Sequence, residues 1–279
     1  MKRRDRQFGH IAACRRGRTQ SFAEARWRVR VDIEIDAGNT RLKWRLRDES
    51  GVSATSVAST PSDIAKAIAS RAVSGGVADS HTPIGRVRIA SVRSPDALAD
   101  FVAECRDLFS LDPQVARVVQ GHAGVTIRYP DPSRLGVDRW LAMLAANAAS
   151  SKACLVVDCG TALTVDKLNA LGEHCGGYIL PGLALMRRSL EENTRIRLDA
   201  GFQLGGSGLG HSTDEAVYHG SLAAAVALIV STLEDASAGG SECELLVTGG
   251  GAVELMPHLL SRGAKLVPDL VLEGLSLAF

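Results

Sequence analysis

One short turn occurs twice in this sequence, with its two aspartates, Asp36 and Asp158, 122 residues apart. Ile33–Trp44 reads IEIDAGNTRLKW, and Val156–Leu168 reads VVDCGTALTVDKL. Each copy has an apolar strand end, then Asp-x-Gly, then small hydroxyl or amide residues and a second strand-like run. A chain that repeats this unit is predicted to contain an internal duplication, with the two turns facing each other across a ligand-binding cleft.

The residue pattern of the first half predicts two hairpin strands, a helix, a strand and a helix. Apolar and polar residues alternate over 29–35, which is the period of a strand. Ser94 followed by Pro95 is a helix-start signal. We predict strands at 29–35, 41–48 and 85–92, and helices at 62–72 and 94–109.

The second half opens with an Ala- and Leu-rich helix after the Pro-broken loop at 129–136. It then repeats the order of a strand hairpin followed by helices and further strands. A Gly-Gly turn is predicted at 176–177, followed by a short strand and a helix that begins near Pro181. The remaining predicted elements are a helix at 137–150, strands at 153–158 and 162–169, a helix at 214–233, a strand, Gly-rich turn and helix within 243–255, a strand near 264–271 and a terminal helix at 272–279.

Charge is unevenly distributed along the 279 residues. Residues 1–30 carry ten Lys or Arg and two acidic residues, whereas the rest carries 22 basic and 29 acidic residues, a net charge of −7. We expect residues 1–30 to form a basic, disordered extension, followed by α/β domains at 31–135 and 136–279. The acidic body argues against a nucleic-acid partner. The longest apolar run, Leu222–Val230, is too short to span a bilayer, so no membrane is expected.

The six cysteines include no C-x-x-C pair. This usage is typical of a reduced, cytoplasmic protein with buried thiols rather than of a zinc site or a disulfide scaffold. Cys159 lies inside the second Asp-x-Gly turn, where it is expected to fill space.

The residues of the two turns are those that a phosphate-binding site needs. Gly38 permits a tight turn and a close approach of backbone N–H groups to an anion. Asn39, Thr40 and Thr161 add short donors, and Lys43 adds positive charge. Asp36 would repel a phosphate, so its place beside one makes sense if it holds a divalent cation. One such turn alone is more often an ordinary hairpin.

A third glycine-rich segment, Val247–Ala252 (VTGGGA), runs from a strand into a helix. Bare backbone at Gly249 and Gly250 would let an adenine ring lie against it. The chain lacks a G-x-x-x-x-G-K-[ST] loop and a G-x-G-x-x-G strand–helix junction, which disfavours a Walker-type NTPase and a dinucleotide-binding oxidoreductase.

Duplicated α/β halves with two phosphate turns and an adenosine turn are the pattern of the acetate and sugar kinase, Hsp70 and actin superfamily. Within it the sequence resembles type III pantothenate kinase, also called the Bvg accessory factor family. The resemblance covers Val31 to the C-terminus and rests on DAGNTRLK, GVDRW, DCGTALT, GGYILPGLALM, GHSTDEAVYHG and TGGGA. It implies two ribonuclease H-like (actin-like ATPase) domains with the active site between them.

The resemblance also implies a reaction. ATP would phosphorylate pantothenate to 4′-phosphopantothenate, the first step of coenzyme A biosynthesis, with Mg2+ and a monovalent cation, K+ or NH4+. The protein would act as a cytoplasmic homodimer, in which the partner subunit helps to close the pantothenate pocket.

Site residues follow from the motifs that match the family. Asp138, in the first turn of the predicted helix, would be the catalytic base, kept ionised by the helix dipole. Asp158 would bind the monovalent cation, and Thr161 would contact the phosphates of ATP. The residues matched to pantothenate binding are Tyr129, Gly136, Val137, Asp138, Arg139 and Thr213. His211, next to Thr213, is expected to be an ordinary loop residue.

Two residues depart from the family pattern, because Asp32 and Glu34 stand where that strand is usually apolar. A buried carboxylate needs a partner, and we expect Glu34 to pair with an arginine such as Arg45.

Two alternatives to this function also stay open: a kinase acting on another small molecule, and a regulatory nucleotide-binding protein that keeps the fold without the activity. A binding-only protein would be free to lose Asp138, Asp36 or Lys43, and this chain keeps all three.

Overall fold

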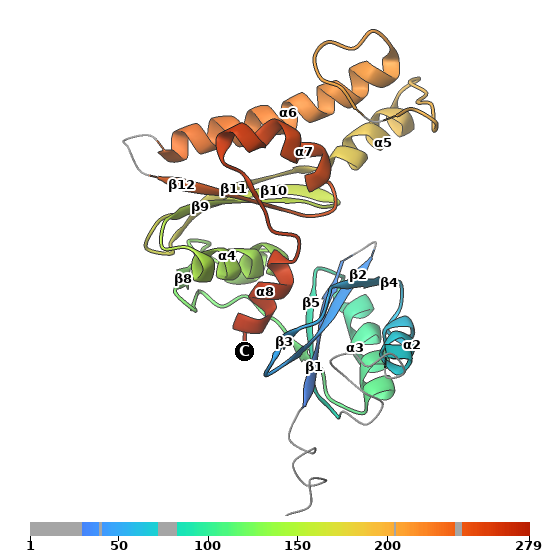
Figure 1. The fold of residues 1–279 in the computed structure, drawn as a ribbon, viewed down its shortest axis with the longest axis vertical. Helices are drawn as coiled ribbons and strands as arrows, with labels where there is room; N and C mark the ends of the chain where they lie inside the picture. Colours follow the sequence, from blue (N-terminus) through green and yellow to red (C-terminus); the bar gives the residue numbers. More distant parts are fainter. Residues whose placement is uncertain (1–29, 39–40, 72–82, 204, 238–241) are drawn as a thin grey trace, which may run out of the picture.

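A computed structural model describes residues 30–38, 41–71, 83–203, 205–237 and 242–279 of the chain (Figure 1). Nearly all of the predicted basic extension, and the predicted phosphate donors Asn39 and Thr40, lie outside the described residues. The chain forms two sheets with helices on their outer faces and a pair of helices between them (Figure 1).

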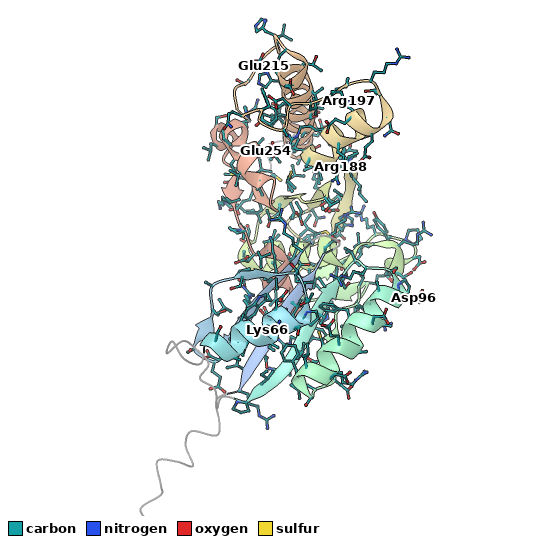
Figure 2. All side chains as sticks on the ribbon, turned by 90° about the vertical axis from the view of Figure 1, so that its right-hand side faces the viewer. Lys66, Asp96, Arg188, Arg197, Glu215 and Glu254 are labelled. Carbon is teal, nitrogen blue, oxygen red and sulfur yellow. The ribbon has the colours of Figure 1, made fainter. Side chains whose placement is uncertain are left out.

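The first sheet has the strand order β3-β2-β1-β5-β6, with β4 also paired to β2. Its strands are β1 (Val31–Ala37), β2 (Leu42–Asp48), β3 (Gly51–Val52), β4 (Ser56–Ala58), β5 (Ile84–Ser91) and β6 (Gln114–Val115). The outer face is covered by α2 (Pro61–Arg71) and α3 (Pro95–Phe109), which carry Lys66 and Asp96 in Figure 2. Ser94 caps α3 as predicted, because its hydroxyl accepts a hydrogen bond from the backbone N–H of Ala97.

The second sheet has the order β11-β10-β9-β12-β13. Its strands are β9 (Ala153–Cys159), β10 (Ala162–Leu168), β11 (His174–Pro181), β12 (Cys243–Thr248) and β13 (Lys265–Leu266). Helices α6 (Thr213–Ser237) and α7 (Ala252–Leu259) pack on its outer face, with α5 (Leu183–Asn193) beside α6. Minor elements are a hairpin of β7 (Gly121–His122) and β8 (Val125–Thr126) and the 3-10 turns η2 (Pro132–Arg134) and η3 (Leu260–Arg262).

The duplication predicted from the two turns is present in the sheets. In each half the first strand, β1 or β9, pairs antiparallel with the strand that follows it, β2 or β10. On its other side it pairs parallel with a later strand, β5 or β12. The fold class is therefore α/β in two related halves, as predicted.

Three predicted elements of the second half were wrong in detail. Gly176 and Gly177 lie inside the edge strand β11, not in a turn, because β11 begins at His174 and pairs with β10 along its length. The last strand, β13, has only two residues. The terminal helix α8 (Leu270–Leu277) begins earlier than predicted, with Asp269 at its N-cap.

Two helices lie between the sheets, namely α4 (Val137–Ala149) and α8 (Figure 1). Both are apolar on several sides, and their buried side chains form one core with residues of β5, β9 and β12. The two helices touch at Gly274, where an added Cβ would collide with the backbone carbonyl of Leu141. Only a glycine lets α8 approach α4 this closely.

The polar face of β1 meets α8 through buried charges. Glu34 is fully buried and accepts hydrogen bonds from Arg45 at 2.7 Å and Arg47 at 2.9 Å, so the predicted Glu34–Arg45 pair is confirmed. Arg45 also bonds to Glu273 and to the carbonyl of Leu272 on α8. The two unusual acidic residues of β1 thus have partners, since Asp32 pairs with Arg86 at 2.8 Å.

Helix α6, at 25 residues, is long and apolar enough to cross a membrane by length and composition, the one such helix in the part of the chain that the structure describes. The expectation that no helix crosses a membrane rested only on the length of the apolar run Leu222–Val230 within α6. The buried side chains of α6 belong to the core of the second half, together with residues of β9, β10 and β12. Core helices of this kind pass the same test.

The contact between α4 and α8 yields a test of the fold. We expect Gly274→Ala to lower the free energy of unfolding by about 1–3 kcal/mol, since the methyl group has no room beside the Leu141 carbonyl. Thermal unfolding measures this effect. Gly220→Ala is the matched control, because Gly220 also lies in a helix but has open space around it. The packing described here is wrong if both variants unfold at or above the wild-type temperature.

Candidate active site

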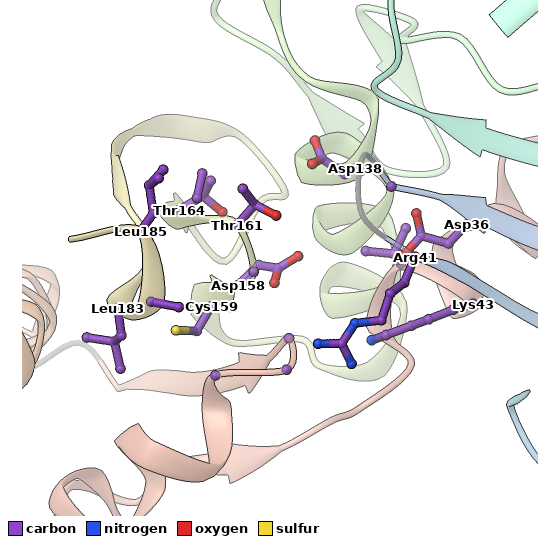
Figure 3. A pocket seen from close by; sticks show the side chains of 18 of the residues that line it. Asp36, Arg41, Lys43, Asp138, Asp158, Cys159, Thr161, Thr164, Leu183 and Leu185 are labelled. Atoms are coloured by element: carbon purple, nitrogen blue, oxygen red, sulfur yellow. The ribbon is translucent and has the colours of Figure 1, made fainter. Parts of the chain in front are cut away.

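A cavity of about 580 Å³ lies between the two halves, at the ends of β1 and β9. Its wall comes from the turns after both strands, the first turn of α4, the start of α5 and the Gly-rich turn between β12 and α7. Figure 3 shows Asp36, Asp138 and Asp158 around this space, each from a different element. The two Asp-x-Gly turns therefore face each other across one cavity, as predicted.

The first turn brings a carboxylate and an ammonium group together. Asp36 on β1 is directly opposite Lys43 on β2 in the strand pairing. The Lys43 ammonium donates a hydrogen bond to the carbonyl of Pro268 at 3.3 Å, just before α8. Asp36, Gly38 and Lys43 all line the cavity.

The second turn is packed tightly against the Gly-rich segment. Gly249 has φ +89°, and a Cβ there would collide with the Asp158 carboxylate and the backbone of Cys159. The backbone N–H of Gly251 donates to the carbonyl of Cys159 at 2.8 Å. Bare backbone at the Gly-rich turn therefore borders the cavity beside Thr161.

Burial and mutual repulsion raise the pKa values of the carboxylates that line the cavity. Burial, opposed by Lys43 and reinforced by Asp158 and Asp138, raises the pKa of Asp36 to about 7. Burial together with Asp138 raises the pKa of Asp158 to about 6. Such shifts are common where a site is built to bind a cation or move a proton.

Asp138 lies in the first turn of α4, as predicted, with Gly136 at the N-cap and Val137 buried in the core. The backbone N–H of Arg139 donates to its carboxylate at 2.7 Å. Burial nevertheless raises the pKa of Asp138 above its usual value, with the backbone hydrogen bond and Arg139 opposing the shift. A raised pKa makes the carboxylate a stronger base, and the expectation that the helix dipole keeps it ionised at neutral pH stays a prediction.

Arg139 does not line the cavity. Its guanidinium is buried and forms two hydrogen bonds with Asp166 on β10, at 2.8 Å and 2.5 Å. A third nitrogen donates to the hydroxyl of Tyr129 at 3.2 Å. The structure therefore joins Arg139, which follows Asp138 in the sequence, to Tyr129, and neither residue is part of the cavity wall.

The other predicted site residues divide by position. The described nucleotide and cation candidates and Asp138 all line the cavity: Asp36, Gly38, Lys43, Asp138, Asp158, Thr161, Gly249 and Gly250. Gly136 and Val137 are at the start of α4 but outside the cavity wall. Thr213 is exposed at the first position of α6, also outside the wall.

Three charged cavity residues were not predicted from the sequence. Arg41 precedes β2 and Arg188 lies on α5, so each half contributes an arginine (Figure 3 shows Arg41 beside Lys43). Glu254, in the first turn of α7 and labelled in Figure 2, also lines the cavity and is paired with Arg187 at 2.9 Å. Arg41 lies inside the DAGNTRLK motif, in which only Lys43 was assigned as a cation. No short motif marks Arg188 and Glu254, because their positions depend on how helices of the second half meet the cleft.

The donor set fits a magnesium ion held jointly with a nucleotide. Among the described residues, neither Asp36 nor Asp158 accepts a hydrogen bond, and no group of three or more His, Cys, Asp or Glu converges as a metal cage. Mg2+ typically uses one or two protein carboxylates and completes its shell with water and phosphate oxygens. The cavity offers such carboxylates together with Lys43, Arg41 and Arg188 for phosphate.

Two solved structures share this fold. A Baf family protein from Campylobacter jejuni aligns with a TM-score of 0.54 at 17% identity, covering 88% of this chain and 95% of that one. The ethanolamine utilization protein EutJ from Carboxydothermus hydrogenoformans aligns with a TM-score of 0.50 at 11% identity, covering 89% and 90%. Fold and cleft together define an α/β protein with the duplicated, actin-like fold.

Sequence comparison narrows the class. A sequence model of type III pantothenate kinase matches residues 33–235. The type III pantothenate kinase of Azotobacter vinelandii is 40% identical over 253 residues, covering 88% of this chain and 97% of that protein. That of Pseudomonas paraeruginosa is 38% identical over 263 residues, covering 88% and 98%. The chain belongs to the type III pantothenate kinase family.

The raised pKa of Asp36 predicts a pH-dependent stability. A carboxylate whose pKa is higher in the folded state stabilises the fold at low pH, and this contribution is lost as pH rises from about 4 to about 7. Asp36→Asn removes the buried charge. Without nucleotide or divalent ions, we expect it to raise the unfolding temperature by about 2 °C or more at pH 8, and by less at pH 5.

Thermal unfolding of both proteins from pH 5 to pH 8 measures this difference. Asp107→Asn, at an exposed position on α3, is the control and should follow the wild-type pH profile. A difference between Asp36→Asn and wild type that is the same at every pH would contradict the burial account.

Proposed function

We propose that the cleft carries out the reaction of its family with Asp138 as the proton acceptor. The reaction is the ATP-dependent phosphorylation of pantothenate to 4′-phosphopantothenate, the first step of coenzyme A biosynthesis. One observation supports this most directly: Asp138 borders the same cavity as both Asp-x-Gly turns and the Gly-rich turn. A base at that place can reach a hydroxyl that faces the terminal phosphate of a nucleotide.

The nucleotide side of the cleft would bind ATP through its backbone and cations. The bare backbone at Gly249 and Gly250 would take the adenosine, while Gly38, Lys43 and Thr161 contact the phosphates. Asn39 and Thr40, predicted as further donors, follow Gly38 in the sequence and lie outside the described residues. Asp36 would hold Mg2+ together with phosphate oxygens, and the ion would neutralise charge that develops on the transferred group.

The charges in the cavity also favour a monovalent cation at Asp158. Three carboxylates around one cavity repel one another, and this repulsion contributes to the raised pKa values of Asp36 and Asp158. K+ or NH4+ at Asp158 would offset the charge of these carboxylates and of the incoming phosphates.

The acceptor side would be formed by the start of α4 and its neighbours. Of the residues matched to pantothenate binding, Asp138 lines the cavity and would accept the proton from the pantothenate hydroxyl. Gly136, Val137, Arg139 and Tyr129 lie around the start of α4 but outside the cavity wall, so the acceptor would bind where the cavity borders them. Phosphoryl transfer depends mainly on positioning and charge neutralisation, so a correctly placed carboxylate suffices as base.

Thr213 would complete the pantothenate pocket across a homodimer. Its exposed place at the start of α6 leaves it available to a partner subunit. We place the dimer in the cytoplasm, where ATP is the phosphoryl donor.

Replacing the proposed base should stop chemistry but not nucleotide binding. We expect Asp138→Asn to lower kcat for pantothenate-dependent ADP release by about 10²–10⁴-fold, with little change in the affinity for ATP. Asp100→Asn, on the exposed face of α3, is the control and should keep wild-type activity. A folded wild-type protein that binds ATP but does not turn over pantothenate would favour a regulatory protein or another acceptor.

The cation proposal has its own test. Wild-type activity should be higher in K+ or NH4+ than in Na+ at the same ionic strength. Asp158→Asn should abolish this difference and lower activity by roughly tenfold or more, the loss typical when support of a metal site is removed. An unchanged K+ dependence in this variant would place the monovalent ion elsewhere.

A further inference from the structure

A second group of polar side chains is buried beside the cavity, and Asp166 is at its centre. Asp166 lies on β10 and is 2% exposed. It accepts two hydrogen bonds from Arg139 and one, at 2.9 Å, from Nε2 of His174 on β11. Arg139 in turn donates to Tyr129. Asp166, His174, Arg139 and Tyr129 therefore form one connected network, called the Asp166 network below.

His174 is fixed from two directions. Its ring is fully buried and stacks on Tyr129, with ring centroids 5.8 Å apart and 25° between the planes. Its Nε2 faces Asp166, which accepts only if this nitrogen carries a proton. Within the described part of the chain, Nδ1 of His174 has no hydrogen-bond partner. A buried imidazole held by one hydrogen bond and one ring contact keeps a fixed orientation beside Tyr129 and Asp166.

The backbone of β11 is shaped to leave room for the network. Gly177 is paired with Asp166 across the β10–β11 ladder. A Cβ at Gly177 would collide with the backbone carbonyl of Val165, and would lie 2.5 Å from the Asp166 carboxylate and 2.9 Å from the Arg139 guanidinium. Only glycine therefore fits at this position of β11, next to the backbone of β10 and the Arg139–Asp166 pair.

The network leaves Arg139 with little freedom. Two of its guanidinium nitrogens are bonded to Asp166, and the third is shared with the Tyr129 hydroxyl. Burial would by itself raise the pKa of Asp166, but hydrogen bonds from His174 and Arg139 lower it below its usual value. The pair is therefore ionised, and the positive charge of Arg139 is largely compensated before any acceptor binds.

We infer that Asp166 and His174 are positioning residues for the acceptor subsite, which hold Arg139 and Tyr129 in the orientation that receives pantothenate beside Asp138. This inference rests on the proposed function, since it takes Arg139 and Tyr129 as residues that contact the bound pantothenate. His174 restrains both residues, Tyr129 through ring stacking and Arg139 through Asp166. Pre-organised groups bind a ligand at a lower entropic cost.

The positioning role is separable from a purely structural one by steady-state kinetics. Asp166→Asn keeps the shape of the side chain and removes its charge, so Arg139 loses its fixed orientation. We expect the KM for pantothenate to rise by roughly tenfold or more, while the KM for ATP changes by less than about twofold. Glu34→Gln is the matched control, because it also breaks a buried ion pair with an arginine. It should lower stability without changing the KM for pantothenate.

His174 provides a second test that leaves the Arg139–Asp166 pair in place. His174→Phe keeps a ring beside Tyr129 but removes the donor to Asp166, and should also raise the KM for pantothenate. His174→Gln returns an N–H near the Nε2 position and should recover most of the loss. This rescue distinguishes hydrogen bonding from packing, and it remains informative if Asp166→Asn does not fold.

Two results would overturn the inference. One is an unchanged KM for pantothenate in folded Asp166→Asn and His174→Phe proteins. The other is that the KM for pantothenate and the KM for ATP rise together, and that Glu34→Gln has the same effect on both. That result would assign the network to stability alone. Failure of the proposed function is a different outcome, since wild type itself would then show no pantothenate-dependent turnover.

Discussion

The close packing of α4 on α8 between the two sheets is the constraint on which the rest of the structure depends. Gly274 permits that contact, and the resulting core joins side chains of both halves. Because α4 is held there, its first turn brings Asp138 to the mouth of the cleft between Asp36 and Asp158. The two Asp-x-Gly turns would be separate hairpins without this layer. With it they form one site.

The same layer explains the electrostatics of the site. Three carboxylates border a cavity in which Lys43 is the cation that lowers the pKa of both Asp36 and Asp158. Such an arrangement is unfavourable for a ligand-free protein and favourable once cations enter with a nucleotide. The repelling carboxylates thus lower the stability of the ligand-free protein at the position where we propose that the reaction takes place. By contrast, the buried Glu34 and Arg45 on the other side of α8 form an ion pair with each other, which serves the fold.

Much of this arrangement was predictable from sequence, because it is local. Alternating residues identified β1, Ser94 identified the start of α3, and the repeated turn identified the duplication and two of the aspartates that line the cavity. The Asp166 network was not predictable, since Asp166 and His174 lie on β10 and β11, which approach Arg139 only in the folded chain. For the same reason Gly177 was assigned to a turn, although its lack of a side chain serves a contact between β11 and α4.

The central claim is that the helical layer places Asp138 against the hydroxyl that receives the phosphoryl group. The most direct test is a crystal structure with Mg2+, a non-hydrolysable ATP analogue and pantothenate. The account predicts the 4′-hydroxyl within hydrogen-bond distance of the Asp138 carboxylate, about 2.6–3.2 Å, and in line with the terminal phosphate. Pantothenate bound outside the cleft, or with its hydroxyl against a different side chain, would contradict it.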